Sequence, residues 1–404
     1  MIEKVFLFGS ACLERLFLHL KKTFIRAQEK CFRLFLDSKG FKFFLLLCLL
    51  GYFVYTTVVG LYFEQFGNRY TFSNILLDYN FGIIRRGLTG EIASWFFTPP
   101  IEYKDYLIFY HIRFAAIMVL FLGLFYRLIK KGMPFLLILL PLITYPTLLR
   151  FVWSDFGRTE PWGTIACLLL FFIPHKTFAR VFILAVIPVL MLFHINQLVT
   201  YVSSILLIYW ILWGEKKDLK SIVYFLFYTG ISFLVVSYAS SPDVDLQTLF
   251  EYISSKTSDV TYKPKNFKGP YTGVVSEIIK SFYKPQYWVM VFSVHWNLLI
   301  MPLSIYFMYR CFEKSGLLRI GSLFGKYSIL ILVPYGVVFL LTDYGRFFAT
   351  YTTCMYLVLM AMYFKHSRDE TVLPLEQKPE AFWLIVFVCL MGCKLLVMPD
   401  LFYN

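Results

Sequence analysis

The chain has 404 residues, of which 59% are hydrophobic and only 16% are charged, and its formal net charge is +14. Typical soluble domains are about 25% charged, so this composition excludes a water-soluble globule. It also excludes intrinsic disorder and a secreted module built on disulfides. The class that remains is an all-α polytopic membrane protein, a bundle of transmembrane helices.

Residues 1–42 predict a cytoplasmic amphipathic segment that precedes a transmembrane bundle over 43–404. Apolar residues in this segment recur at spacings of three and four, and basic residues lie mainly on the other faces. Such a pattern is typical of a helix lying on a membrane surface. A cytoplasmic tail helix that packs on the bundle would have the same pattern, so both interpretations stay open.

Eleven apolar stretches are candidate transmembrane helices, because about 20 mostly apolar residues cross a bilayer. They are 43–63, 107–126, 133–149, 161–174, 181–194, 198–213, 221–240, 288–309, 327–341, 347–364 and 381–399. Two long connections, 64–106 and 241–287, are predicted as outer loops. The first is expected to contain an interfacial amphipathic helix near 84–97, and the second is expected to form a partly helical lid.

The distribution of charge predicts the orientation of the chain. With the N-terminus in the cytoplasm, 24 of the 39 basic residues fall in inner segments and 13 in outer segments. Cytoplasmic loops are the ones enriched in Lys and Arg, so the N-terminus is expected inside and the C-terminus outside. Orientation alone accounts for the net charge, and no nucleic-acid partner is expected. The cysteines lie in spans or inner segments, so no extracytoplasmic disulfide framework is expected.

Polar motifs concentrate on the predicted outer side, beginning with Asp78, Arg85 and Arg86 in the first outer loop. A carboxylate in a partly dry cavity can take a proton from an attacking hydroxyl, and guanidinium groups match phosphate oxygens. Gly87 and Gly90 would allow the backbone to approach a ligand closely. Alternatively, the arginine pair only anchors a helix to lipid phosphate.

Asp155, Arg158 and Glu160 form a second motif, directly before Pro161. Pro is favoured as the first residue of a helix, and an acidic residue there interacts with the positive end of the helix dipole. Helix capping is therefore the alternative to a functional role for Glu160. Arg113 falls inside a predicted span, where an ionisable residue indicates either a function or a side chain that reaches the interface.

Two further motifs lie at predicted span ends. His194, Asn196 and Gln197 fall where the chain reverses between two spans, and Asp343 and Arg346 precede another span. Each has a purely structural alternative: a hydrogen-bonded histidine inside the bundle, and an ion pair closed on itself across a tight turn. No Walker A sequence, no zinc-ligand spacing and no G-x-S-x-G motif is present. No cofactor is predicted, and a divalent metal ion stays possible.

A long first outer loop with an early acidic residue, followed by an interfacial helix, resembles the GT-C superfamily of integral-membrane glycosyltransferases. The similarity covers the first half of the chain and one late motif. It is carried by Asp78-Tyr-Asn-Phe-Gly-Ile-Ile-Arg85-Arg86-Gly87, Arg158-Thr-Glu160-Pro161, His194 and Asp343-Tyr-Gly-Arg346. Similar sets occur in membrane proteins associated with bacterial surface polysaccharides, including O-antigen.

The resemblance implies a sugar donor linked to polyprenyl phosphate or pyrophosphate, a glycan or lipid-linked acceptor, and a place in the bacterial inner membrane. It implies Asp78 as the general base. Residues that would hold the phosphate are Arg85, Arg86, Arg158 and Arg346. The GT-C acid often has an acidic neighbour in sequence, which Asp78 lacks.

These observations favour an inverting glycosyltransferase or polysaccharide polymerase acting at the extracytoplasmic face. A transporter or flippase of an anionic lipid-linked substrate is the alternative in another class, and it would need polar groups near the bilayer midplane. A non-catalytic subunit of an envelope assembly is the third possibility. Clustering of the polar motifs on one side favours the enzyme.

Overall fold

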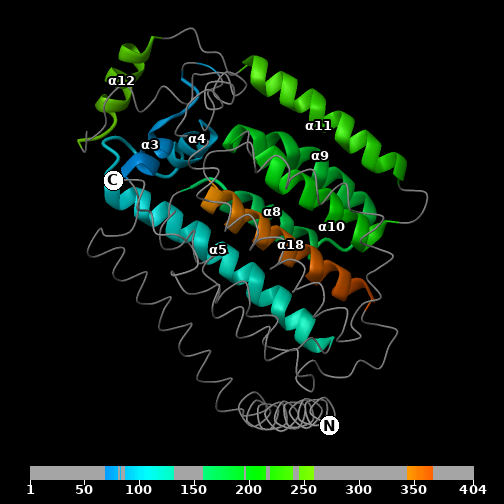
Figure 1. Cartoon of the computed structure of the whole chain (residues 1–404). Coiled ribbons are helices and arrows are strands. Elements are labelled where there is room, and N and C mark those ends of the chain that lie inside the picture. Colours follow the sequence, from blue (N-terminus) through cyan, green and yellow to red (C-terminus); the bar gives the residue numbers. More distant parts are fainter. Residues whose placement is uncertain are drawn as a thin grey trace, which may run out of the picture.

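A computed structural model describes the helical bundle and the segments at one of its ends (Figure 1). The described residues are 69–80, 82, 87–131, 158–194, 197–214, 219–239, 245–258 and 344–366. The segment 1–42 and the predicted spans 43–63, 133–149, 288–309, 327–341 and 381–399 lie outside them. Within the described ranges the chain is helical and no residue lies in a strand, as the sequence predicts.

Within the described ranges six apolar segments build the bundle, and each overlaps a predicted span. They are α5 (Tyr103–Lys130), α8 (Pro161–Leu170), α9 (Lys176–Phe193), the π-helix η2 (Leu198–Val202) continued by α10 (Ser203–Trp213), α11 (Leu219–Ala239) and α18 (Tyr344–His366). Three of them are long and apolar enough to cross a membrane: Tyr103–Lys130, Lys176–Phe193 and Lys220–Tyr238. The expected total of about eleven spans stays a prediction.

Helix ends differ from the predicted spans because hydropathy marks only the apolar part of a helix. The α5 helix begins at Tyr103, four residues earlier than predicted, where Glu102 and Asp105 form a reciprocal capping box. It ends with Arg127 and Lys130 in its last turn, where the helix dipole favours cations. The α18 helix likewise begins at Tyr344, so residues 344–346 are helical, whereas Asp343 and the ion pair proposed for it lie outside the described residues.

Three short helices pack at one end of the bundle: α3 (Arg69–Leu76), α4 (Leu88–Ser94) and α12 (Leu246–Ser255). With the first turns of α5 they enclose a second apolar cluster, separate from the main core and referred to below as the end cluster. Its members include Phe72, Leu76, Tyr106, Leu249 and Ile253. Figure 1 shows these helices gathered near the start of α5. The end cluster therefore holds residues of both predicted outer loops against the bundle.

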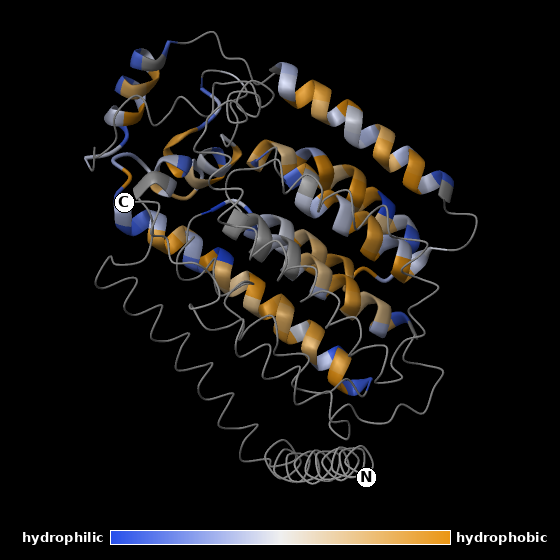
Figure 2. Ribbon diagram, viewed as in Figure 1, coloured by the Kyte–Doolittle hydropathy of each residue, from blue (hydrophilic) through white to orange (hydrophobic). Residues whose placement is uncertain are grey.

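The surface of the bundle carries large apolar side chains, as expected for helices facing lipid. Val119 on α5, Phe178 on α9 and Phe227 on α11 are each more than three-fifths exposed. Figure 2 shows apolar residues distributed along these helices rather than confined to the interior. A soluble monomer rarely exposes contiguous apolar surface of this extent. The described bundle therefore has the surface of a membrane protein.

Basic side chains at the opposite end of the bundle donate hydrogen bonds to neighbouring helix ends. Arg127 Nη1 donates to Phe171 O at 2.8 Å, and Lys365 Nζ donates to Leu212 O at 3.0 Å. Carbonyl groups at helix C-termini have no intrahelical partner and carry partial negative charge, so cations stabilise them. This is the end that the charge distribution assigns to the cytoplasm, and its orientation in a membrane stays a prediction.

Candidate functional site

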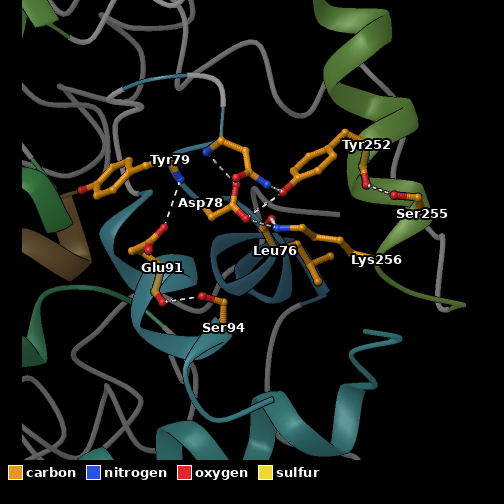
Figure 3. Close-up of polar contacts among 9 residues, drawn as sticks. Leu76, Asp78, Tyr79, Glu91, Ser94, Tyr252, Ser255 and Lys256 are labelled. Atoms are coloured by element: carbon orange, nitrogen blue, oxygen red, sulfur yellow. Dashed lines mark hydrogen bonds and ion pairs between the residues drawn. The ribbon is translucent and has the colours of Figure 1, made fainter. Parts of the chain in front are cut away.

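A buried carboxylate lies at the end-cluster side of the bundle, just after α3 (Figure 3). Asp78 is 7% exposed, and its Oδ2 accepts a hydrogen bond from Tyr252 OH at 2.8 Å and forms an ion pair with Lys256. Its Oδ1 accepts the backbone N–H of Asn80 at 3.2 Å. Asn80 Nδ2 also donates to the Tyr252 hydroxyl. The carboxylate, the phenol and the ammonium form a connected polar group, referred to below as the Asp78 site.

The amphipathic pattern of α12 explains how Tyr252 and Lys256 reach Asp78. Leu249 and Ile253 lie one helical turn apart and are buried in the end cluster. Tyr252 and Lys256 follow at the same spacing on an adjoining strip of the helix. The backbone at the end of α12 is held by a hydrogen bond from Ile101 N to Lys256 O at 2.7 Å.

The environment of Tyr252 keeps its hydroxyl a donor. Burial raises the pKa of Tyr252, the hydrogen bond to Asp78 raises it further, and the neighbouring Lys256 opposes both effects. Burial and the charge of Glu91 also raise the pKa of Tyr79. Both phenols are therefore protonated at neutral pH, and Asp78 receives a neutral donor and a cation at the same oxygen.

The start of α12 supplies a prediction about pH. Asp245 caps the helix by accepting bonds from Gln247 N and Thr248 N at 2.8 and 2.9 Å, and Thr248 Oγ1 donates to it as well. These bonds, with that from the Thr248 side chain the largest cause, lower the pKa of Asp245. Its contribution to helix stability is thus present above its unfolded pKa and is lost as pH falls through the lower folded pKa.

We expect Asp245→Ala to increase hydrogen exchange over 246–255 at neutral pH, because the helix loses its N-cap. The matched variant Asp245→Asn keeps a capping side chain, so its protection should stay near that of the wild type at neutral pH. It should also lose less protection than the wild type below pH 4, after correction for intrinsic exchange rates. Equal protection in all three proteins at both pH values would contradict this role.

Helix α4 lies beside the Asp78 site and only partly matches its prediction. Glu91 Oε2 accepts the backbone N–H of Tyr79 at 3.4 Å, which ties α4 to the loop after Asp78. Trp95 directly follows the helix and is exposed, as expected at an interface, whereas Leu88 and Ile92 pack against the core. The predicted apolar face therefore does not lie wholly on lipid, because half of it covers the bundle.

Gly90 allows a close approach, as predicted, and the partner that the structure shows is protein backbone. A Cβ atom at Gly90 would lie 2.0 Å from Leu77 O, so the missing side chain allows α4 to contact the segment that follows α3. The close approach that the sequence indicates is thus made to the protein backbone, and a ligand is not needed to explain it.

A second polar group lies where α8 begins, between α5 and η2. Glu160 is 3% exposed and stands at the N-cap position of α8, as the capping alternative predicts, but its side chain makes no capping hydrogen bond. Pro161 is the first helical residue, as predicted. Arg113 is 4% exposed, donates Nη1 to Arg158 O, interacts electrostatically with Glu160, and lies 4.2 Å from the Tyr110 ring centroid. Arg113 is therefore held inside the bundle by the Arg158 carbonyl and the Tyr110 ring.

Gln197 connects this second group to the turn after α9. Its Nε2 donates to Thr159 O at 2.6 Å, and its backbone N–H donates to His194 O at 2.9 Å. His194 is 8% exposed at the end of α9. The π-helix η2 begins at the next residue, Leu198, and π-helical turns frequently occur at functional sites. Residues of the second and third sequence motifs thus lie together at one end of the bundle.

The structure does not describe every predicted site residue. Five of them lie outside the described residues, so their predicted roles stay predictions: Arg85, Arg86, Asp155, Asn196 and Asp343. For Arg346 the structure describes only the backbone, in the first turn of α18. Their place in a common site therefore stays a prediction.

Sequence reasoning missed the two partners of Asp78. Tyr252 and Lys256 lie in the segment predicted as a lid. The aromatic residues named there as candidates for binding a sugar follow them in the chain. The signal was present: Asp245 is a strong N-cap residue, and Leu249 and Ile253 recur at helical spacing after it. That pattern predicts the helix and its buried face, although it does not predict which carboxylate the face would meet.

Within the described ranges, no group of three or more His, Cys, Asp or Glu side chains could hold a metal ion. The described residues form a helical protein, and three of their helices are long and apolar enough to span a membrane. No protein-family model, no curated protein and no solved structure matches the chain.

Proposed function

We propose that the protein is an inverting membrane glycosyltransferase or polysaccharide polymerase that takes its sugar from a polyprenyl-phosphate or pyrophosphate carrier. The supporting observation is the Asp78 site: a buried carboxylate, an ammonium and a phenol at one end of an apolar helical bundle. The apolar surface of the helices would contact the polyprenyl tail within the lipid. The Lys256 ammonium, at the end of the bundle, would then lie near the phosphate of the carrier.

The chemistry assigned to this site is a single displacement. The acceptor oxygen attacks the anomeric carbon, its proton passes to Asp78, and the bond between that carbon and the carrier phosphate oxygen breaks with its electron pair staying on the phosphate. A positioned carboxylate base contributes about 100- to 10,000-fold to such steps. Fixed positive charge stabilises the departing phosphate, which is the role proposed for Lys256 and the predicted phosphate arginines.

Sugar transfer can be tested directly with the purified full chain in lipid nanodiscs. A mixed pool of labelled lipid-linked sugars from bacterial membranes is supplied with a glycan or lipid-linked acceptor. We expect protein-dependent movement of label to the acceptor, with release of one carrier phosphate or pyrophosphate for each bond formed. A donor pool that stays intact in every acceptor series would contradict the proposal.

A transporter is the second candidate, because Arg113 and Glu160 are ionisable residues buried between spans. Such residues often line substrate or proton pathways. In sealed vesicles a transporter would move the labelled lipid-linked sugar to the other leaflet with its sugar still attached. An enzyme would release carrier phosphate without that movement, so the two functions give different products.

A further inference from the structure

Lys256 is the cation of the Asp78 site, and its ammonium is almost enclosed by protein. Its side chain is 11% exposed, it forms the ion pair with Asp78, and Nζ lies 3.3 Å from Leu76 O. Nζ also lies over the face of the Tyr252 ring, 4.4 Å from its centroid. Figure 3 shows the ammonium pointing back from the end of α12 toward the carboxylate. The cation thus lies between an anion, a carbonyl and an aromatic face.

Contacts other than the ion pair also hold α12 on the bundle. Leu249 and Ile253 are already buried in the end cluster, and the Ile101 N to Lys256 O bond fixes the backbone at the end of the helix. A lysine on a fixed backbone keeps a flexible four-carbon stem, so its ammonium can change partners without moving the helix. The backbone of Lys256 is therefore held in place by contacts that do not involve its ammonium group.

We propose that Lys256 is a phosphate-binding residue that exchanges Asp78 for the phosphate of a polyprenyl-linked ligand, so that ligand binding releases the carboxylate. The identity of the ligand rests on the function proposed above. Phosphate offers more acceptor oxygens and at least as much negative charge as a carboxylate, so it can replace Asp78 as the partner of the ammonium. Asp78 is then free of its ion pair, and open to the acceptor hydroxyl, only once the donor is bound.

Binding measurements test this exchange without any sugar transfer. The probes are farnesyl phosphate and its uncharged alcohol farnesol, added to the full chain in nanodiscs of neutral lipid at fixed salt. Lys256→Gln should weaken farnesyl phosphate binding by about 10-fold or more, because a charge-assisted hydrogen bond is lost, and leave farnesol binding unchanged. The matched control is Lys104→Gln, which removes an exposed lysine from the start of α5 and should bind both probes like the wild type.

The distinguishing variant is Asp78→Asn, which should tighten farnesyl phosphate binding several-fold because the phosphate no longer competes with the carboxylate. In the double variant Asp78→Asn/Lys256→Gln this gain in affinity should disappear, because the ammonium that binds the phosphate is absent. A purely structural ion pair predicts the opposite: both single variants weaken binding of both probes, and both lose hydrogen-exchange protection over 246–255. That result would overturn the proposal.

A competition experiment separates a lipid-borne phosphate from a free one. Inorganic phosphate at the same concentration should displace labelled farnesyl phosphate far less than unlabelled farnesyl phosphate does. Equal displacement would overturn the assignment of a polyprenyl-linked ligand. If these binding results hold and sugar transfer is absent, the phosphate site stands and the proposed enzyme activity fails, so the two proposals can be judged separately.

Discussion

Asp78→Asn is expected to reduce sugar transfer by at least about 100-fold, because the amide cannot accept the acceptor's proton in the displacement step. The substitution preserves the size of the side chain and an oxygen that can accept from Tyr252 OH. The measurement is the initial rate of label transfer from lipid-linked donor to acceptor, with protein amount normalised in the nanodiscs. Activity near the wild-type rate would remove Asp78 from the mechanism.

Two controls separate chemistry from folding in this experiment. Asp78→Asn leaves Lys256 without its counter-ion, and an unpaired buried charge destabilises its surroundings. The double variant Asp78→Asn/Lys256→Gln removes both charges and should be equally inactive while keeping α12 protected from hydrogen exchange. Asp105→Asn changes a carboxylate of the α5 capping box near the same end of the bundle and should retain transfer activity.

Gly163→Ala is expected to destabilise the bundle strongly. A Cβ atom at Gly163 would lie 2.2 Å from Tyr201 Cγ and 2.6 Å from Gln197 Oε1, inside the bundle between α8 and η2. Tyr201 is fully buried and is held by a 2.9 Å hydrogen bond between its hydroxyl and Thr164 Oγ1. Because neither neighbour can move freely, we expect a destabilisation of about 3 kcal/mol, at the upper end for overpacked cores.

The matched control for this prediction is Gly230→Ala in α11. A Cβ atom there would meet nothing within 4 Å, so only the helical preference of alanine acts, and stability should rise by about 0.5–1 kcal/mol. Both variants are compared with the wild type by reversible unfolding in mixed detergent micelles. If the two substitutions had equal effects, close packing at Gly163 would not determine stability.

Much of the fold could be predicted because it depends on local properties of the chain. The span predicted at 221–240 corresponds to α11 at Leu219–Ala239, and that at 198–213 corresponds to η2 and α10. A run of apolar residues is helical in a bilayer whatever its neighbours are, since its backbone groups must bond within the segment. Helix ends were less predictable, because caps such as the Glu102–Asp105 box extend helices beyond their apolar part.

The candidate site was only half predictable. Asp78, Glu160 and His194 were identified from residue type and position, and all three are buried at or near helix ends. Their partners were not identified. Lys256 is separated from Asp78 by 178 positions, and Arg113 reaches Arg158 O across 45 positions.

Composition and periodicity therefore established that this chain is a bundle of apolar helices with polar groups concentrated beyond particular helix ends. Those features follow from the free energy of transferring apolar side chains out of water, which depends on the residues of each segment and not on their neighbours in space. The pairing of charges depends instead on which helices pack together. Burial of the apolar strip of α12 in the end cluster brings Lys256 to Asp78, and a charge removed from water needs a partner within a few ångströms. Only the tertiary structure could decide which carboxylate that would be.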